Sequence, residues 1–253
     1  EIHVHPSEPW LAYCSEFPAN CGAVNYQTNQ QFGLWAGNVL FDSSGTLLTD
    51  NGEFNLATGE FTNSFYASYY PGMALSESNQ LLFNQKPRDD HITDRQIVVS
   101  NRQDGSVIDT IARKVFPVSE LVVLDDSNFG FFTAPFGTSF LYGVDIANLS
   151  LQGDQFPAPV YKADFNDGWL VGSGNGFSML LRLDDPDQTK LFDFTINSFQ
   201  LTEEFLIYAR EQAIYRYGLY TGETVTLHEF ESPVHEIAVL DESGDRVVAR
   251  LNY

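Results

Sequence analysis

The chain has 253 residues, 43% of them hydrophobic and 14% aromatic, which is enough apolar surface for a large core and argues against disorder. With 13 Lys and Arg against 34 Asp and Glu, its formal net charge is −21. Such a surface repels phosphate groups, so nucleic acids and anionic membranes are disfavoured partners, and no apolar run is long enough for membrane insertion. The excess acid favours solubility or a cationic partner, and both readings stay open.

The first segment of the chain, 1–16, predicts a hairpin. His3 and His5 lie two residues apart in an extended segment, which points both side chains to one face and makes them candidate metal ligands. A surface histidine pair without further ligands is more often coincidental. The chain starts at Glu1 without Met, which suits a mature secreted product or a trimmed one.

The two cysteines, Cys14 and Cys21, stand close together in CSEFPANC. This spacing allows a local disulfide, and two free thiols are the competing reading. A disulfide favours a secreted or periplasmic location, because disulfides persist where the surroundings are oxidising. Two cysteines without CxxC spacing make a zinc site improbable.

From residue 36 onward, one unit recurs: an apolar stretch, a tight polar turn, a second apolar stretch and a further hairpin. Its copies begin at NVLFDSSGTLLTD, MALSESNQLLFNQ, LVVLDDSNFGFFTA, KADFNDGWLVGSG, SFQLTEEFLIYAR and EIAVLDESGDRVVAR. Their turns recur at the spacing of about 35–50 residues that is typical of propeller blades. The chain therefore predicts an all-β fold, a single six-bladed β-propeller over 1–253 with little helix.

The expected blades are 36–66, 72–114, 119–156, 160–196, 198–231 and 234–253. The last has only two strands, which is too few for a stable sheet, so we expect 1–16 to supply the missing pair. The ring would then be closed by N-terminal strands that complete the last blade, and the cysteine pair would fix this closure.

The motif carried by FDSSGTLLTD and LDESGDRVVAR resembles the repeats of the TolB and PD40 class of WD40-like propellers. The resemblance implies a propeller with a tendency to bind and transfers no catalytic residues. It also implies that the loop between the second and third strands lies on the face that most often binds ligands. The GH and WD dipeptides of WD40 repeats proper are missing.

Two segments are candidate binding sites. The second unit carries an insertion, QKPRDDHITDRQ, that contains Arg88, Asp89, Asp90, His91, Asp94 and Arg95. Long loops on a rigid scaffold often carry function, although charges that pair among themselves are the commoner explanation. Between the first two blades stands TNSFYASYYPG, with Tyr66, Tyr69 and Tyr70. Clustered tyrosines suit carbohydrate or protein contact, and packing between blades explains them nearly as well.

No catalytic motif is evident. GxSxG is absent, and GSGNG at Gly172 lacks the lysine and helix of a phosphate loop. The acidic turns at Asp125, Phe165 and Asp184 depart from the calcium-loop pattern, so calcium is a possible cofactor and solvated turns are the simpler reading.

The sequence thus predicts an extracytoplasmic, non-catalytic binding or scaffold propeller, monomeric on its own, that holds a protein or glycan partner. The alternative is a carbohydrate-active enzyme, a glycoside hydrolase or lyase, with carboxylates at the central channel. Ligand identity and source lie beyond the sequence, and the chain can be a piece of a longer protein.

Overall fold

The structure is a computed structural model. It describes residues 2–14, 21–34, 36, 39–49, 51–63, 73–76, 78, 81–88, 91–104, 106–115, 118–123, 128–133, 140–145, 150–155, 160–241 and 243–251. Within these ranges, the side chains of 63, 73–74, 81–88, 91–96, 109, 111–155 and 186 lie outside the description. The described residues form strands, turns and bends and no helix, so the all-β expectation is confirmed. Accordingly, the described part of the chain has no helix that could cross a membrane.

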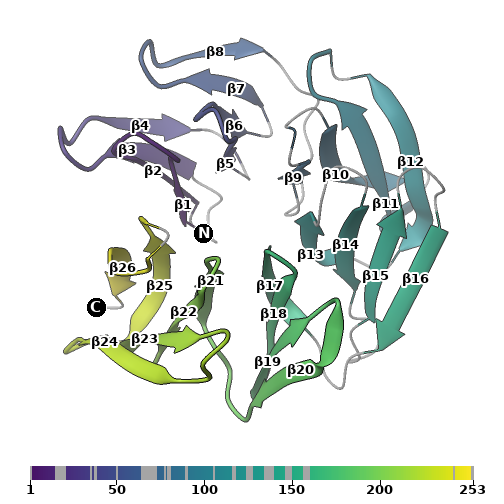
Figure 1. The fold of residues 1–253 in the computed structure, drawn as a ribbon. Helices are drawn as coiled ribbons and strands as arrows, with labels where there is room; N and C mark the ends of the chain where they lie inside the picture. The colour runs from purple at the N-terminus through teal and green to yellow at the C-terminus, as the bar shows by residue number, and fades with distance from the viewer. Residues whose placement is uncertain are drawn as a thin grey trace. The chain divides into compact units, whose positions relative to one another are not determined.

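The chain divides into two compact units, each considered by itself: Glu1–Pro135 with Phe140–Asp154, and Phe136–Ser139 with Gln155–Tyr253. The first unit holds four sheets of four strands, with antiparallel pairing in every pair whose register is described (Figure 1). Their strands are β1 (Ile2–Val4), β2 (Trp10–Cys14), β3 (Cys21–Asn25), β4 (Gln31–Leu34), β5 (Val39–Phe41), β6 (Leu47–Thr49), β7 (Gly52–Asn55), β8 (Glu60–Asn63), β9 (Met73–Leu75), β10 (Leu81–Arg88), β11 (His91–Asn101), β12 (Val107–Val115), β13 (Val118–Val123), β14 (Asn128–Thr133), β15 (Phe140–Asp145) and β16 (Ser150–Gln155).

The second unit holds two sheets of four antiparallel strands and one sheet of two. Their strands are β17 (Val160–Asn166), β18 (Trp169–Gly174), β19 (Phe177–Arg182), β20 (Asp185–Phe192), β21 (Ser198–Leu201), β22 (Phe205–Arg210), β23 (Ala213–Gly218), β24 (Thr224–Glu229), β25 (Val234–Val239) and β26 (Val247–Leu251). The first strands of successive sheets lie side by side, β17 against β21 and β21 against β25.

The six-blade count is not confirmed, because the described strands form seven sheets. The expected pairing of 1–16 with the last blade is not confirmed either. β1 and β2 pair instead with β3 and β4, so 2–34 make a four-stranded sheet of their own. The physical reason is local. Cys14 at the end of β2 and Cys21 at the start of β3 lie directly opposite each other and are joined by a disulfide, so β3 continues the meander of β1 and β2.

The sheet β21–β24 is packed on both faces, as β22 shows. Leu206 and Tyr208 join a cluster with Trp169, Leu180 and Phe192 of the preceding sheet. The alternate residues Ile207 and Ala209 join a second cluster with residues of β25, among them Val234, Ile237 and Val239. Because successive side chains of a strand point to opposite faces, one strand contributes to two cores.

Two turns of the recurring motif have a common structure. In the turn from β5 to β6, one carboxylate oxygen of Asp42 accepts hydrogen bonds from Ser44 Oγ at 2.7 Å and the Thr46 N–H at 2.8 Å. In the turn from β25 to β26, Asp241 accepts from Ser243 Oγ at 2.9 Å and from the Asp245 N–H at 3.1 Å. The Asp-x-Ser-Gly sequence is therefore a turn in which the carboxylate caps backbone donors, as short Asp side chains commonly do.

Candidate functional site

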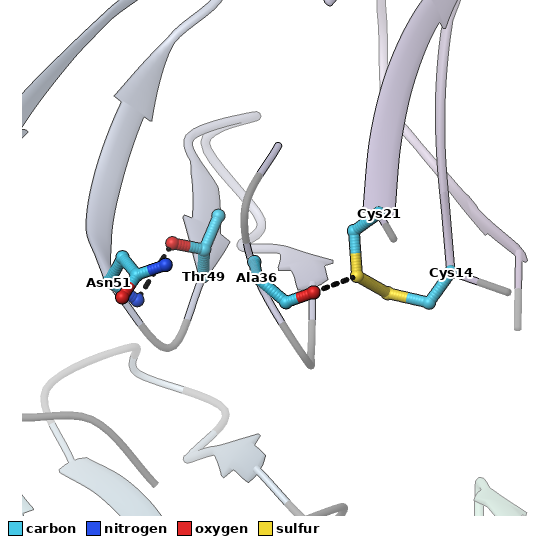
Figure 2. The surroundings of a disulfide bond; sticks show 5 residues. All are labelled: Cys14, Cys21, Ala36, Thr49 and Asn51. Carbon is cyan, nitrogen blue, oxygen red and sulfur yellow. Dashed lines mark hydrogen bonds between the residues drawn. A yellow bond between two sulfur atoms is a disulfide. The ribbon is translucent and has the colours of Figure 1, made fainter. Parts of the chain in front are cut away.

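The disulfide expected between Cys14 and Cys21 is present (Figure 2). It links the end of β2 to the start of β3, and Cys21 Sγ lies 3.0 Å from the Ala36 carbonyl oxygen, in the segment that leads to β5. In the sheet β17–β20, Ser173 and Ser178 face each other in the same way. Ser173 Oγ donates to the Ile196 carbonyl at 2.8 Å, again in the segment that leads to the next sheet. The disulfide thus occupies a structural position that a serine pair fills elsewhere.

His5 is a buried turn cap in this fold, with 7% of its surface exposed. Its Nδ1 accepts hydrogen bonds from the N–H groups of Ser7 at 3.1 Å and Glu8 at 2.9 Å. An Nδ1 that accepts two hydrogen bonds has no lone pair left for a metal. His3 lies on β1 and is partly buried. Among the residues whose side chains are described, no group of three or more His, Cys, Asp or Glu could hold a metal ion. Metal binding at His3 and His5 stays a prediction.

The insertion is a hairpin and not the loop that we expected. β10 and β11 run through it and pair as far as Arg88 with His91, and Arg95 lies opposite both Pro87 and Val115. The side chains of Arg88, His91, Asp94 and Arg95 lie outside the description, as do Asp89 and Asp90 altogether. The tyrosine candidates Tyr66, Tyr69 and Tyr70 also fall outside the described residues.

The described surface holds a group of side chains that the sequence analysis missed. It consists of Arg182 at the end of β19, Leu183 and Asp184 in the turn from β19 to β20, and Tyr220 in the turn from β23 to β24. We call these four residues the Tyr220 patch. Tyr220 is 60% exposed and Leu183 is 36% exposed, whereas Trp169 behind them is 3% exposed. An exposed aromatic next to an exposed aliphatic side chain is typical of a contact surface.

Arg182 holds the Tyr220 patch together. Its Nε donates to Asp184 Oδ1 at 2.7 Å, its Nη2 to Oδ2 at 3.4 Å, and its Nη1 to the Tyr220 hydroxyl at 3.3 Å. The guanidinium carbon lies 5.6 Å from the ring centre of Trp169 and 6.0 Å from that of Tyr220. The two rings meet edge to face with centroids 6.0 Å apart. Tyr220 is thus a pre-positioned aromatic group, which limits the side-chain entropy lost when a partner binds.

Carboxylates dominate the charge around this patch. The guanidinium bond to Asp184 lowers the pKa of that carboxyl, so Asp184 keeps its charge and neutralises Arg182. Asp167, Glu204 and Glu223 are exposed in the adjoining turns. In the sheet β17–β20, the Leu183 N–H donates to the carbonyl of Gly168, next to Asp167. In the sheet β21–β24, the Leu219 N–H donates to the carbonyl of Glu204, so the neighbouring turns of each sheet are fixed to each other. The result is an apolar centre in a negative rim.

Sequence signals for this patch existed but were weak. The tyrosine in LYTGET stands in the turn itself, where polar residues are usual, and Trp169 is one of only three tryptophans. What brings Arg182 onto Tyr220 is the packing of one sheet on the next, which a repeat pattern does not reveal.

Asp164 is a second notable carboxyl, on the first strand of the sheet β17–β20. Burial raises the pKa of Asp164 to about 6, and hydrogen bonds from the Leu201 and Phe165 N–H groups offset part of this rise. These bonds are 2.7 Å and 2.9 Å long and occupy one oxygen each. With both oxygens engaged by backbone, Asp164 ties β17 to β21. The carbohydrate-active alternative requires a carboxyl pair around substrate, and it stays a prediction.

We expect the contribution of Asp164 to stability to depend on pH. A folded-state pKa of about 6, raised from 3.8, means that the folded protein holds a proton which the unfolded chain releases. The stabilising effect is fully present below the unfolded pKa and is lost as pH rises through 6. Relative to Asp164→Asn, the wild type should therefore lose about 2 kcal/mol of unfolding free energy between pH 4 and pH 7.

Urea unfolding of both proteins across that range checks this prediction. Asp167→Asn, an exposed change in the following turn, is the control for removal of one negative charge. A difference between wild type and Asp164→Asn that stays constant from pH 4 to pH 7 would contradict it.

Comparison with known proteins shows the fold. No family model matches the chain, and no curated protein matches it in sequence. It is similar to the structure of U3-55K, with a TM-score of 0.74 and 14% identity over 99% of this chain and 87% of that one. It is also similar to the RRP9 WD40 repeats, with a TM-score of 0.73 and 14% identity over 99% and 86% of the two chains. For the Dos1 propeller the TM-score is 0.67 and the identity 9%, over 98% and 88%.

At identities this low the likeness establishes the fold and nothing more specific, and membership of the TolB and PD40 class stays a prediction. The four-stranded antiparallel sheets of this chain are blades, and its fold is that of the WD40-repeat β-propellers.

Proposed function

We propose that the chain is a non-catalytic binding propeller that holds a protein partner through the Tyr220 patch. The single observation that carries this proposal is the exposed Tyr220 ring, fixed by Arg182 above a buried tryptophan. Tyr, Trp and Arg are the residues that most often dominate binding energy at protein interfaces. A propeller fold supports the proposal, because its sheets form a rigid scaffold that holds the turns between strands in place for binding.

The chemistry of the patch selects the partner. Tyr220 and Leu183 offer apolar contact, while the carboxylates of Asp167, Glu204 and Glu223 attract cations. A segment with an apolar side chain flanked by Lys or Arg fits this arrangement, and the net charge of −21 steers such a partner toward the chain. A glycan is the alternative partner that the sequence left open, because exposed tyrosines also bind carbohydrate.

The experiment begins with proteins that co-isolate with the tagged chain in its native host, followed by affinity measurement with the purified partner. Tyr220→Ala should weaken binding by about 30-fold or more, the loss typical of a central aromatic contact. Tyr220→Phe keeps the ring and should weaken binding less. Tyr161→Ala is the matched control, because Tyr161 is a 48% exposed tyrosine of the same unit that lies outside the patch.

The same assay separates the two candidate surfaces. If Asp90→Ala with His91→Ala abolishes binding while Tyr220→Ala does not, the partner is held by the insertion hairpin and the Tyr220 patch is excluded. If neither variant changes the affinity, both surfaces are excluded.

We also propose an extracytoplasmic location. The buried Cys14–Cys21 disulfide supports it, since such bonds persist in oxidising compartments. Rapid alkylation of protein taken from its native source should leave both cysteines unlabelled, and labelled cysteines would contradict the proposal.

A further inference from the structure

The cysteine pair has a structural equivalent in the second unit. Cys14 faces Cys21 across β2 and β3, and Ser173 faces Ser178 across β18 and β19, which are likewise the second and third strands of their blade. The residues that lead to each pair also correspond, WLAYC in β2 and WLVGS in β18. All four side chains are buried. The two blades can therefore be compared residue by residue.

The serine pair shows what side chains at this position do. Ser173 Oγ donates to the Ile196 carbonyl at 2.8 Å, and Ser178 Oγ accepts from the Ile196 N–H at 2.8 Å. Ser178 Oγ also donates to the Phe194 carbonyl at 3.0 Å. Ile196 lies in the segment that leads to β21. The pair thus holds the start of the next blade by both backbone groups of one buried residue, and we call such a pair with the residue that it holds a latch.

In the first unit, the residue that corresponds to Ile196 is Ala36, in the segment that leads to β5. Cys21 Sγ lies 3.0 Å from the Ala36 carbonyl oxygen (Figure 2). Ala36 is buried in one apolar cluster with both cysteines and Val39. A disulfide sulfur has no hydrogen, so it donates nothing to this carbonyl, and a buried carbonyl without a donor costs free energy. The disulfide therefore closes the pair but leaves out the hydrogen bond of the serine latch.

Reduction of the disulfide supplies this donor. A dithiol gives two electrons and two protons to the pair: the S–S bond breaks, an S–H bond forms on each cysteine, and the dithiol becomes a disulfide. The Cys21 thiol is then a donor within reach of the Ala36 carbonyl. The Cys14 thiol lies opposite it, as Ser173 lies opposite Ser178. The reduced pair has the arrangement of a serine latch with sulfur in place of oxygen.

We propose that Cys14 and Cys21 form a redox-reversible latch, in which hydrogen-bonded thiols replace the disulfide on reduction and the blade β1–β4 keeps its hold on Ala36. The chain then folds under oxidising and under reducing conditions. This role is independent of binding at the Tyr220 patch. It is also separate from the location of the protein, because alkylation of native protein reports which form is made and the latch concerns whether the reduced form stays folded.

Infrared spectroscopy of the reduced chain tests the hydrogen bond directly, because the S–H stretching band comes from these two cysteines alone. The intact chain is unfolded in urea, reduced with a water-soluble phosphine that has no S–H group, and refolded with the phosphine present. One S–H band of the folded chain should lie at lower frequency than the band of the unfolded chain. Cys14→Ser leaves only the Cys21 thiol and should keep this band. A single band at higher frequency, which is typical of a buried thiol without an acceptor, would overturn the proposal.

Urea unfolding under reducing conditions tests what the hydrogen bond contributes. Cys14→Ser with Cys21→Ser rebuilds the serine latch and should be at least as stable as the reduced wild type, since a hydroxyl is a stronger donor than a thiol. Cys14→Ala with Cys21→Ala removes both donors and should raise the equilibrium constant of unfolding by about tenfold or more. Cys14→Ala with Cys21→Ser is the matched control. It keeps the donor next to Ala36 and should resemble the double serine variant.

Two further results would overturn the proposal. Reduced wild type that fails to refold while the double serine variant folds would mean that thiols do not replace the disulfide. Equal unfolding constants for the double serine and double alanine variants would mean that no hydrogen bond is made at this position. If the double alanine variant does not fold, the infrared band and the refolding of the reduced wild type decide. Neither result bears on the Tyr220 patch, whose binding assay uses the disulfide-bonded chain.

Discussion

Replacing Gly45 by alanine should lower the free energy of unfolding by about 2–4 kcal/mol, because two independent costs meet at this residue. Gly45 has a φ of +87°, a conformation that side chains rarely adopt. A Cβ at this position would also overlap Nε2 and Cε1 of His5. His5 has little room to move, because its Nδ1 caps the turn at Ser7 and Glu8. Urea unfolding of the variant measures the loss.

Two controls separate these costs. Gly176 has a φ of +78°, and a Cβ at that position would have no other atom within 4 Å, so Gly176→Ala carries only the backbone cost of about 1 kcal/mol. In a His5→Ala background, Gly45→Ala should also cost only about 1 kcal/mol, since the ring that it would strike is gone. Equal losses for Gly45→Ala with and without His5 would contradict the contact.

The turn at Gly45 also illustrates what sequence could and could not reveal. The Asp-x-Ser-Gly pattern is local, and the hydrogen bonds of Asp42 and Asp241 follow from it. His5 is different, because its neighbour in space is 40 residues away. Read locally, His3 and His5 form a strand pair with a common face, whereas β1 ends at Val4 and His5 begins a turn.

The same distinction explains the blades. Alternation and turn residues located the strands from β5 onward, because each blade is a local meander. The partners of 1–16 were inferred from the need to complete the last blade, and they turned out to be the adjacent residues 21–34. Arg182 and Tyr220 come from two blades, so no pattern within one repeat could predict their contact.

Ile207→Ala and Leu206→Ala should each lower the free energy of unfolding by about 3–4 kcal/mol, although the two residues are adjacent. Both side chains are fully buried. Leu206 belongs to the cluster shared with β18 and β19, and Ile207 to the cluster shared with β25. In an ordinary half-exposed sheet, one of two neighbouring residues faces water and its truncation costs little. In a propeller each blade lies between two others, so truncation of either side chain should lower the free energy of unfolding.

The exposed Leu191→Ala serves as the control, because Leu191 is 63% exposed on the edge strand β20 and its loss should be within about 0.5 kcal/mol. Urea unfolding of the three variants under one condition makes the comparison. An Ile207→Ala cost as small as that of Leu191→Ala would mean that the face toward β25 is not packed in solution. The blade β25–β26 would then be detached from its neighbour.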